Sequence, residues 1–326
     1  MKQQNTLETV ANSPLGYELR KSIAARYLTG SGIEIGALNS PLEIPNNVTV
    51  RYLDRMPINQ LRQHYPELSQ CDLVEIDIVD DGETLATVAS NTVDFIIANH
   101  MIEHCQNPIL TIKNWLRTIK LGGILYMAVP DKRYTFDIDR PVTDLEHLIR
   151  DYTEGPKWSR NAHFEEWARI IDKVQEHEVT ARAQFIAEIN YSIHFHVWTQ
   201  VEFVELLLYC RNNLSLPIEI ELLQKDGVEF ICVLRKTSEE LACVNSLIAQ
   251  KLESNQPSAL KQEHLPSPLH PQQMNQLQSQ LQSTQTKLQE AESLIAAMET
   301  SKFWKLRKKW FKLKKLIGLK EQDVEL

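Results

Sequence analysis

The stretch Gly32–Leu42, which reads Gly-Ile-Glu-Ile-Gly-Ala-Leu-Asn-Ser-Pro-Leu, decides the fold. It begins as an apolar strand with an acid at Glu34, and a turn follows at Gly36. A second apolar run starts at Val48 and ends at another acid, Asp54, 20 residues after Glu34. An acid and a glycine after one strand, with a second acid about 20 residues later, is typical of doubly wound folds that bind an adenosine ligand.

Strand and helix patterns alternate on both sides of this stretch. We predict strands at 32–35, 48–53, 73–78, 93–98 and 124–129, with helices at 17–28, 57–65, 108–119 and 199–210 and a helical turn at 85–89. Gly122-Gly123 is expected to end the helix at 108–119. Two further strands, 218–223 and 229–234, are joined through Lys225-Asp226-Gly227 as a hairpin. The pattern predicts an α/β, Rossmann-like, doubly wound, mostly parallel seven-stranded sheet with an antiparallel terminal hairpin.

A helical insert separates the fifth strand from the last helix. Residues 131–196 contain two helical patterns, near 142–152 and 164–188. Because the insert leaves the carboxyl end of a sheet strand, we expect it to form a cap over the ligand crevice.

The ends of the chain differ from its middle. We divide it into a polar lead-in at 1–15, the α/β domain at 16–240 and a Pro/Gln/Ser linker at 254–272. Residues 273–300 follow a heptad pattern typical of a coiled coil, which would allow oligomers, or of a single amphipathic helix. We predict that residues 301–320 form a basic amphipathic helix, suited to an anionic membrane surface, to docking on the acidic body or to a role as a spacer.

Composition narrows the class of protein. The net charge of −8 gives no nucleic-acid signature. The five cysteines are scattered without metal-type spacing, which indicates reduced thiols. We find neither a signal-peptide core nor an apolar run of the roughly 20 residues that span a bilayer. We therefore expect a cytoplasmic protein, with peripheral contact at the inner face of the membrane as an addition.

The order of elements and motifs resembles the class I S-adenosylmethionine-dependent methyltransferases over Tyr17 to Lys236. The resemblance implies S-adenosyl-L-methionine as cofactor. The positions that it assigns to the cofactor are Glu34, Ile35 and Gly36 in the first motif, Asp54 for the ribose, Asp77 and Ile78 for adenine, and Asn99 at the start of a segment that continues to His104. Ala37 and Asn39 replace glycines that would cradle a pyrophosphate, which disfavours a nicotinamide cofactor.

The segment after the fifth strand is the expected acceptor side. It is similar to a segment in bacterial methyltransferase-domain proteins that are associated with glycosyltransferases. Cations and hydrogen-bonding groups there suit a glycan, a phosphate or a carboxylate, and a salt-bridged loop that anchors the cap is the alternative. The candidate acceptor residues are Asp131, Lys132, Arg133, Tyr134, Arg140 and His196.

Transfer of a methyl group to oxygen requires a base, and histidine titrates near neutral pH. His104 is our first candidate because it follows the fourth strand, and His163 and His194 come next. If the segment around His194 is extended, His194 and His196 face the same side, and with His163 they could bind a metal. Since neither a carboxylate nor a cysteine clearly completes that set, we predict no metal.

Two functions follow from these observations. The first is O-methylation of a glycan or another small polar acceptor by direct displacement. The second is a methyltransferase-like interaction module that acts through its coiled-coil and basic tail, binding a membrane or a glycosyltransferase.

Overall fold

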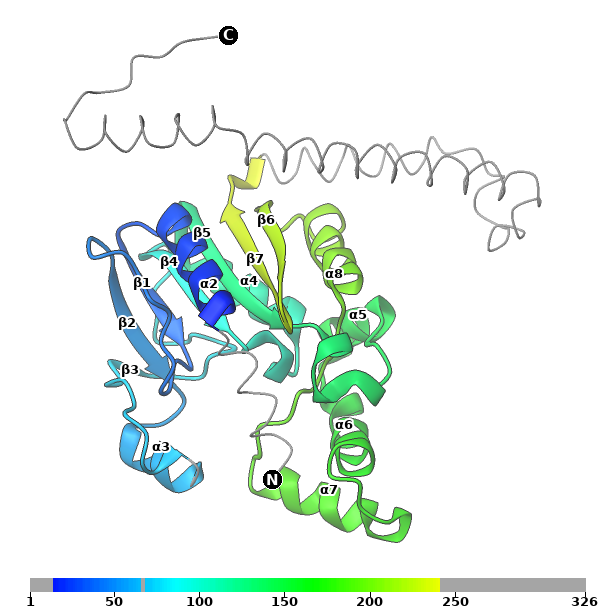
Figure 1. Ribbon diagram of the computed structural model, residues 1–326. Helices are drawn as coiled ribbons and strands as arrows, with labels where there is room; N and C mark the ends of the chain where they lie inside the picture. Colours follow the sequence, from blue (N-terminus) through cyan, green and yellow to red (C-terminus); the bar gives the residue numbers. More distant parts are fainter. Residues whose placement is uncertain (1–13, 66–67, 241–326) are drawn as a thin grey trace, which may run out of the picture. The chain divides into compact units, whose positions relative to one another are not determined.

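The computed structural model describes residues 14–65 and 68–240, and these form a seven-stranded sheet (Figure 1). The strand order is β3-β2-β1-β4-β5-β7-β6. Only β7 runs antiparallel to its neighbours β5 and β6, which confirms the predicted mostly parallel sheet with a terminal hairpin. The strands are β1 (Ser31–Ile35), β2 (Thr49–Asp54), β3 (Ile78–Val79), β4 (Val93–Asn99), β5 (Ile119–Pro130), β6 (Ile218–Asp226) and β7 (Glu229–Lys236).

Helices cover both faces of the sheet. On one face α2 (Pro14–Tyr27) packs Ile23 and Ala24 against the strands β4, β5 and β7. On the other face α4 (Pro108–Thr118) and α8 (Gln200–Asn212) bury apolar side chains at helical spacing. Their starts are set by local sequence: Asn107 caps α4, and Thr199 forms a capping box with Glu202 at α8. A shorter helix, α3 (Ile58–His64), follows β2.

Two expected boundaries around β5 are wrong. The strand begins at Ile119 and runs through Gly122 and Gly123, so these glycines do not end the preceding helix. A Cβ at Gly123 would lie 2.5 Å from the carbonyl oxygen of Asp94 on β4. Glycine is therefore needed there for close approach of two strands.

The third strand is much shorter than predicted, and the expected helical turn at 85–89 is a series of hydrogen-bonded turns. Leu85 in that stretch has a left-handed backbone, with φ of 47°. Helix α2 also begins at Pro14, inside the segment predicted as a polar lead-in.

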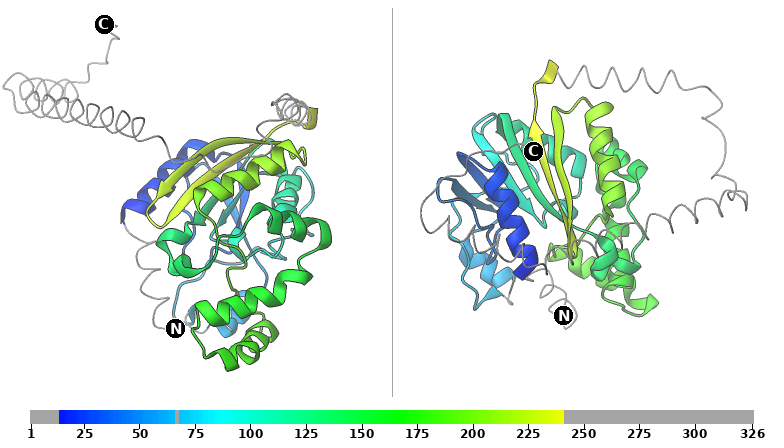
Figure 2. Two further views of the ribbon diagram at one scale, coloured as in Figure 1. Left: turned by 90° about the vertical axis from the view of Figure 1, so that its right-hand side faces the viewer. Right: turned by 45° about the horizontal axis from the view of Figure 1, so that its top comes forward.

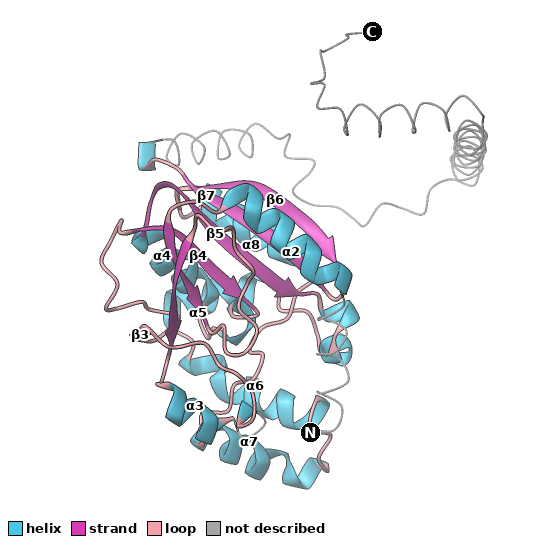
Figure 3. Cartoon of the chain, turned by 60° about the vertical axis from the view of Figure 1, so that its left-hand side comes forward, coloured by secondary structure: helices cyan, strands magenta, loops and turns pink. Residues whose placement is uncertain are grey.

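The cap is built from helices joined by loops (Figure 3). Its elements are η3 (Lys132–Tyr134), η4 (Phe136–Asp139), α5 (Leu145–Glu154), α6 (Lys157–Ile170), η5 (Glu176–Glu178) and α7 (Val179–Glu188). The single helix predicted at 164–188 is wrong, because the chain breaks after α6 and Lys173 takes a left-handed φ of 54°. Helices α6 and α7 pack side by side around Phe164, Trp167 and Ile186 (Figure 2).

The cap leaves and rejoins the sheet domain at one point. Asp131 bridges to Trp198, and the Lys132 N–H donates to the Trp198 carbonyl over 3.0 Å. The carboxyl ends of the parallel strands point toward the side on which the cap lies (Figure 1). The insert therefore lies on the side of the sheet where the parallel strands end.

No helix among the described residues is long and apolar enough to cross a membrane. The predicted linker at 254–272, coiled coil at 273–300 and basic helix at 301–320 lie outside the described residues.

Candidate functional site

The carboxyl ends of β1 and β2 form the expected donor side. Gly36 follows β1 with a φ of 66°, and its N–H donates to the Leu53 carbonyl over 2.9 Å. A Cβ at Gly36 would meet no heavy atom within 4 Å, so the chain leaves open space beside the loop. Asp54 ends β2, and its Oδ1 accepts from the Arg55 N–H over 2.7 Å. Open space beside a carboxylate fits an adenosine whose ribose diol donates two hydrogen bonds.

Glu34 and Ile35 hold the loop from inside. The Glu34 carboxylate is buried, and its two oxygens lie 2.9 and 3.2 Å from the Leu42 nitrogen that donates to them. Burial raises the pKa of Glu34 to about 7 despite this hydrogen bond. The Ile35 side chain belongs to the core. Glu34 therefore positions the loop that follows Gly36. Because the Ile35 side chain lies in the core, only the backbone of Ile35 can contact a ligand.

The two residues that the sequence analysis assigns to adenine, Asp77 and Ile78, both help to hold the edge of the sheet. Asp77 precedes β3, and its Oδ2 accepts from the Tyr52 N–H over 2.7 Å, so this carboxylate secures the edge of the sheet. Ile78 lies in β3 and pairs with Leu53. The acids that follow β3 are Asp80 and Asp81, which the prediction missed. Placing β3 on the β-branched pair Ile78-Val79 would have found them.

Asp80 lies next to Asp54, since the Asp80 N–H donates to the Asp54 carbonyl over 3.1 Å. Its Oδ2 accepts from the backbone and the hydroxyl of Thr87, each over 2.7 Å. Partial burial opposes ionisation, but these bonds lower the pKa of Asp80 overall. Asp80 therefore stays ionised beside Asp54.

A partly buried charge network lies at the ends of β4 and β5. His100 follows β4 with a φ of 49°, and its Nε2 contacts Glu229 at the start of β7. The Arg20 Nε on α2 donates to Glu229 over 2.6 Å. Burial opposes ionisation, but His100 and Arg20 lower the pKa of Glu229 to about 2. Burial likewise opposes protonation of His100, yet Glu229 raises its pKa. Sequence reasoning missed this network because Arg20 and Glu229 are 209 residues apart.

Asn99 is oriented toward the same edge of the sheet. Its Oδ1 accepts from the Ala128 N–H over 3.1 Å. Its buried Nδ2 has no hydrogen-bond partner among the described residues. An unsatisfied buried amide is consistent with a ligand that accepts a hydrogen bond there.

The cap brings two of the three base candidates together. One ligand-type atom from each of Glu103, His104 and His194 lies within 4.8 Å of the others. The His104 Nδ1 donates to the Ile193 carbonyl over 2.8 Å, and the His104 and His194 rings meet edge to face. Burial, with the neighbouring His194, lowers the pKa of His104 to about 3. His104 therefore remains neutral and is a weak base.

His194 has a carboxylate partner that His104 lacks. The His194 Nδ1 lies 2.7 Å from the Asp137 Oδ2, and Arg140 donates to the other Asp137 oxygen over 2.9 Å. Burial opposes ionisation of Asp137, but His194 and Arg140 lower its pKa to about 2. A bond from Nδ1–H to an ionised carboxylate leaves Nε2 as the proton acceptor of His194.

Glu103 completes this group. Both of its carboxylate oxygens are buried and lack a hydrogen-bond partner among the described residues, although Oε1 lies 3.7 Å from His100 Nδ1. Burial raises the pKa of Glu103. The prediction treated Glu103 only as part of a motif and missed it as a functional side chain.

The expected acceptor residues divide into two groups. Asp131 is buried and accepts from Arg133, while the buried Arg140 donates to Asp137 and Glu166, so these contacts fit the alternative of an anchoring loop. The Lys132 Nζ donates to the Ile138 carbonyl over 2.9 Å. Arg133 and Tyr134 remain exposed at the surface. The Lys225 Nζ lies 3.6 Å from the centre of the Tyr134 ring.

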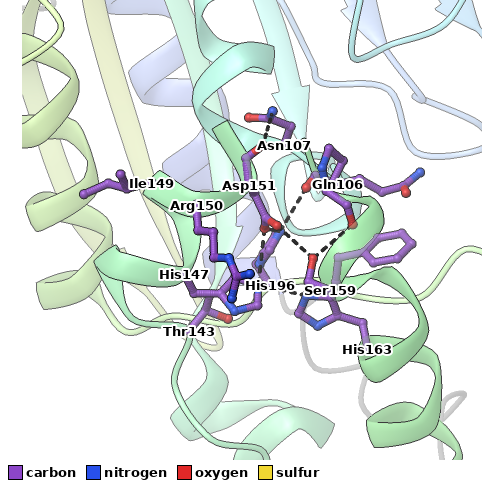
Figure 4. A network of polar contacts seen from close by, with 12 residues as sticks. Gln106, Asn107, Thr143, His147, Ile149, Arg150, Asp151, Ser159, His163 and His196 are labelled. Carbon is purple, nitrogen blue, oxygen red and sulfur yellow. Dashed lines mark hydrogen bonds and ion pairs between the residues drawn. The ribbon is translucent and has the colours of Figure 1, made fainter. Parts of the chain in front are cut away.

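His163 and His196 do not join His194. Both are buried in a second cluster with His147 and Asp151, and His196 therefore offers no exposed surface to an acceptor (Figure 4). His194 contacts Asp137 and His196 lies near Asp151, so the structure places these two histidines in separate clusters rather than in one set with His163. The second cluster includes a carboxylate, Asp151, that the sequence analysis did not group with these histidines. The spacing His-x-x-x-Asp at His147 and Asp151 could have revealed it.

Comparisons with known proteins identify a family that matches this chain. The family described as a methyltransferase domain matches residues 27–205. An S-adenosylmethionine-dependent methyltransferase from Aquifex aeolicus is similar in structure, with 11% identity, coverage of 72% of this chain and 97% of that chain, and a TM-score of 0.41. Another from Thermotoga maritima has 11% identity, coverage of 73% and 97%, and a TM-score of 0.37. None of the curated proteins compared with the chain matches it.

A structure from Rhodobacter sphaeroides, assigned to the zinc-dependent alcohol dehydrogenases, has 12% identity, coverage of 72% and 94%, and a TM-score of 0.42. Structural likenesses of this strength do not separate one activity from another. The family match, in contrast, spans more than half of the chain and includes β1, β2 and β4, with Gly36 and Asp54 at the carboxyl ends of the first two. The chain therefore belongs to the methyltransferase-domain family, and its cofactor is S-adenosyl-L-methionine.

Proposed function

We propose that this protein transfers a methyl group to a hydroxyl oxygen of a polar acceptor such as a glycan, with His194 as the general base. The observation that carries the proposal is the buried His194–Asp137 pair beside the unpaired carboxyl of Glu103. A histidine held by a carboxylate is the usual arrangement for removing a proton from a hydroxyl at neutral pH.

The residues at the carboxyl ends of β1, β2 and β4 bind and orient the cofactor. When bound, S-adenosylmethionine provides an electrophilic methyl group on a sulfonium centre. Asp54 accepts the ribose hydroxyls, Gly36 allows the backbone to come close, and the Asn99 amide donates to the cofactor. Most of the acceleration in a direct displacement comes from holding the two reactants in line.

The acceptor side moves one proton. As the acceptor oxygen bonds to the methyl carbon and the carbon–sulfur bond breaks, the hydroxyl proton passes to the His194 Nε2. Asp137 keeps its negative charge and stabilises the imidazolium that forms. Burial raises the pKa of Glu103, and its carboxyl can hydrogen-bond a neighbouring acceptor hydroxyl.

The choice of His194 rests on a difference among the three candidates. His104 donates Nδ1–H to a carbonyl and its pKa lies near 3, so it is too weak a base. His163 lies in the second cluster, hydrogen-bonded to His147. Only His194 among the three is hydrogen-bonded to a carboxylate, Asp137, which fixes its tautomer.

The acceptor class follows from exposed groups at the entrance to the cap. Arg133 and Tyr134 combine a cation with an aromatic ring, a pairing that suits sugar hydroxyls and attached phosphates or carboxylates. The similarity of the segment at 129–141 to methyltransferase proteins associated with glycosyltransferases supports a glycan. We propose that residues 301–320 bring the enzyme to an anionic membrane surface or to a glycosyltransferase there.

A direct experiment measures release of S-adenosylhomocysteine with a panel of nucleotide sugars and lipid-linked glycans, and locates the new methyl group by NMR. His194→Gln should lower turnover by about 10²- to 10⁴-fold while cofactor affinity, measured by calorimetry, stays unchanged. Turnover by His194→Gln at the wild-type rate would refute its role as base. A methyl group found on nitrogen or carbon would refute O-methylation.

A further inference from the structure

Four side chains from three parts of the cap direct ligand atoms at one another (Figure 4). His147 and Asp151 are one turn apart on α5, His163 lies on α6, and His196 lies in the segment before α8. The His147 Nε2 is 3.0 Å from the His163 Nε2 and 3.2 Å from the Asp151 Oδ2. The His196 Nε2 is 3.5 Å from the same Asp151 oxygen.

These separations suit a single ion at the centre. Ligand atoms that bind zinc tetrahedrally at about 2.0 Å lie roughly 3.3 Å from one another. Three measured distances are close to that value: those of the pairs His147–His163, His147–Asp151 and His196–Asp151. One ligand atom from each of the four residues lies within 4.8 Å of the others, so modest side-chain rotation completes the set.

The charge and hydrogen bonding of Asp151 point to a cation. The side chain is fully buried, and its Oδ2, which faces the histidines, has no hydrogen-bond partner among the described residues. The other oxygen accepts from the Ser159 hydroxyl over 2.8 Å. The Asp151 backbone carbonyl accepts from the Asn107 amide over 2.9 Å. A buried carboxylate oxygen without a partner is costly, and a metal ion would remove that cost.

Aromatic neighbours hold two of the histidines in place. His196 stacks on Trp198, and His163 meets Phe195 edge to face. These two rings are therefore positioned before an ion binds, as is usual for histidines that bind metals.

We propose that His147, Asp151, His163 and His196 bind one divalent transition-metal ion, and that the ion is zinc. Three imidazoles and one carboxylate match the donors that zinc accepts, whereas calcium and magnesium prefer oxygen ligands. Four protein ligands leave no open position, which is the pattern of a structural site. The ion would tie α5 and α6 to the segment that precedes α8. The proposal stands independently of the acceptor and of the base proposed above.

The test uses the full-length protein, purified without chelators or an affinity tag that contains histidine. We expect elemental analysis to find one zinc ion per chain. Metal-free protein titrated with Co²⁺ should develop the intense visible absorption of a tetrahedral cobalt site. His163→Ala and Asp151→Asn should lose both properties, and Ser159→Ala should weaken metal affinity by about 10-fold.

Two control variants locate the ion. His177→Ala removes an exposed cap histidine and should keep both zinc and the cobalt spectrum. His194→Ala disrupts the neighbouring Glu103–His104–His194 group and should also keep them. Circular dichroism and calorimetry with S-adenosylmethionine establish that each variant is folded.

Several outcomes overturn the proposal. One is a wild-type protein that contains no metal after purification and binds none of Zn²⁺, Co²⁺, Mn²⁺ or Fe²⁺ in titration. Another is a His163→Ala variant that binds Zn²⁺ as tightly as His177→Ala does. Loss of the ion in His194→Ala but not in Asp151→Asn would assign it to the other cluster. The cobalt titration of the wild-type protein remains decisive even if a variant fails to fold.

Discussion

Asp137→Asn should destabilise the protein in a way that depends on pH. Asp137 is almost fully buried between His194 and Arg140, and its pKa is about 2 against an ordinary value of 3.8. One pKa unit is worth about 1.4 kcal/mol, so the ionised carboxylate contributes about 2 kcal/mol to the free energy of unfolding. Removing one charge from a buried ion pair costs about 3 to 5 kcal/mol, which makes 2 kcal/mol the lower expectation.

The sign of the pH dependence follows from the lowered pKa. The stabilisation is complete above the ordinary pKa of 3.8 and disappears as the pH falls toward 2. The difference between Asp137→Asn and the wild-type protein should therefore be constant from pH 7 to pH 5 and shrink below pH 4. With a urea dependence of about 2 kcal/mol per molar, the midpoint at pH 7 should fall by about 1 M.

Asp139→Asn is the matched control, because Asp139 is an exposed acid in the same short helix. Urea unfolding followed by circular dichroism at several pH values provides the measurement. We expect the control to unfold with the wild-type protein throughout. Equal midpoints for Asp137→Asn and Asp139→Asn at pH 7, or a difference that does not shrink in acid, would refute the reasoning.

Four further outcomes are expected. Asp54→Ala should lower the affinity for S-adenosylmethionine by roughly 100-fold, since two hydrogen bonds to a carboxylate are lost. Calorimetry measures this affinity, and Asp72→Ala, which removes an exposed acid, is the control. An unchanged affinity in Asp54→Ala would show that Asp54 does not bind the cofactor. Gly36→Val and Gly122→Val should each lose about 1 to 2 kcal/mol of stability because both positions have positive φ, but only Gly36→Val should lose cofactor binding. Burial raises the pKa of Glu103, so the folded state opposes an ionisation that occurs freely in the unfolded state, and the fold loses stability as the pH rises above the ordinary value of 4.5. Glu103→Gln should therefore be more stable than the wild-type protein at pH 8 and equal to it at pH 4. Equal stability at pH 8 would contradict this. A peptide of residues 301–320 should bind anionic vesicles at low salt and dissociate as salt is added, whereas absence of binding at low salt would exclude the membrane proposal.

The sheet and the donor loop could be predicted because their determinants are local. Apolar runs that end in Gly36 and Asp54 specify strands and the residues at their carboxyl ends without reference to distant parts of the chain. Predicted element boundaries were wrong where a contact between residues distant in sequence determines the local structure. Gly123 looks like the end of a helix, yet it is required by the carbonyl of Asp94 on the adjacent strand.

The sequence analysis singled out histidines of the cap but did not group them as the structure does. His194 and His196 are two residues apart, and the sequence alone suggests one site. Their partners, Asp137 and Asp151, belong to different elements of the insert, and only the fold assigns each carboxylate to its histidine. Likewise, nothing local in the sequence links Glu229 to Arg20 or to His100.

The bridge between Asp131 and Trp198 has a consequence for how such proteins diversify. The whole insert departs from the sheet and returns to it at adjacent backbone positions, joined by the bond from Lys132 to Trp198. An insert with neighbouring ends can be exchanged for one of another length without altering the strand order or the register beneath it. Since we propose that the insert selects the acceptor, grafting a different insert between these two residues should change the acceptor and keep the methyl donor.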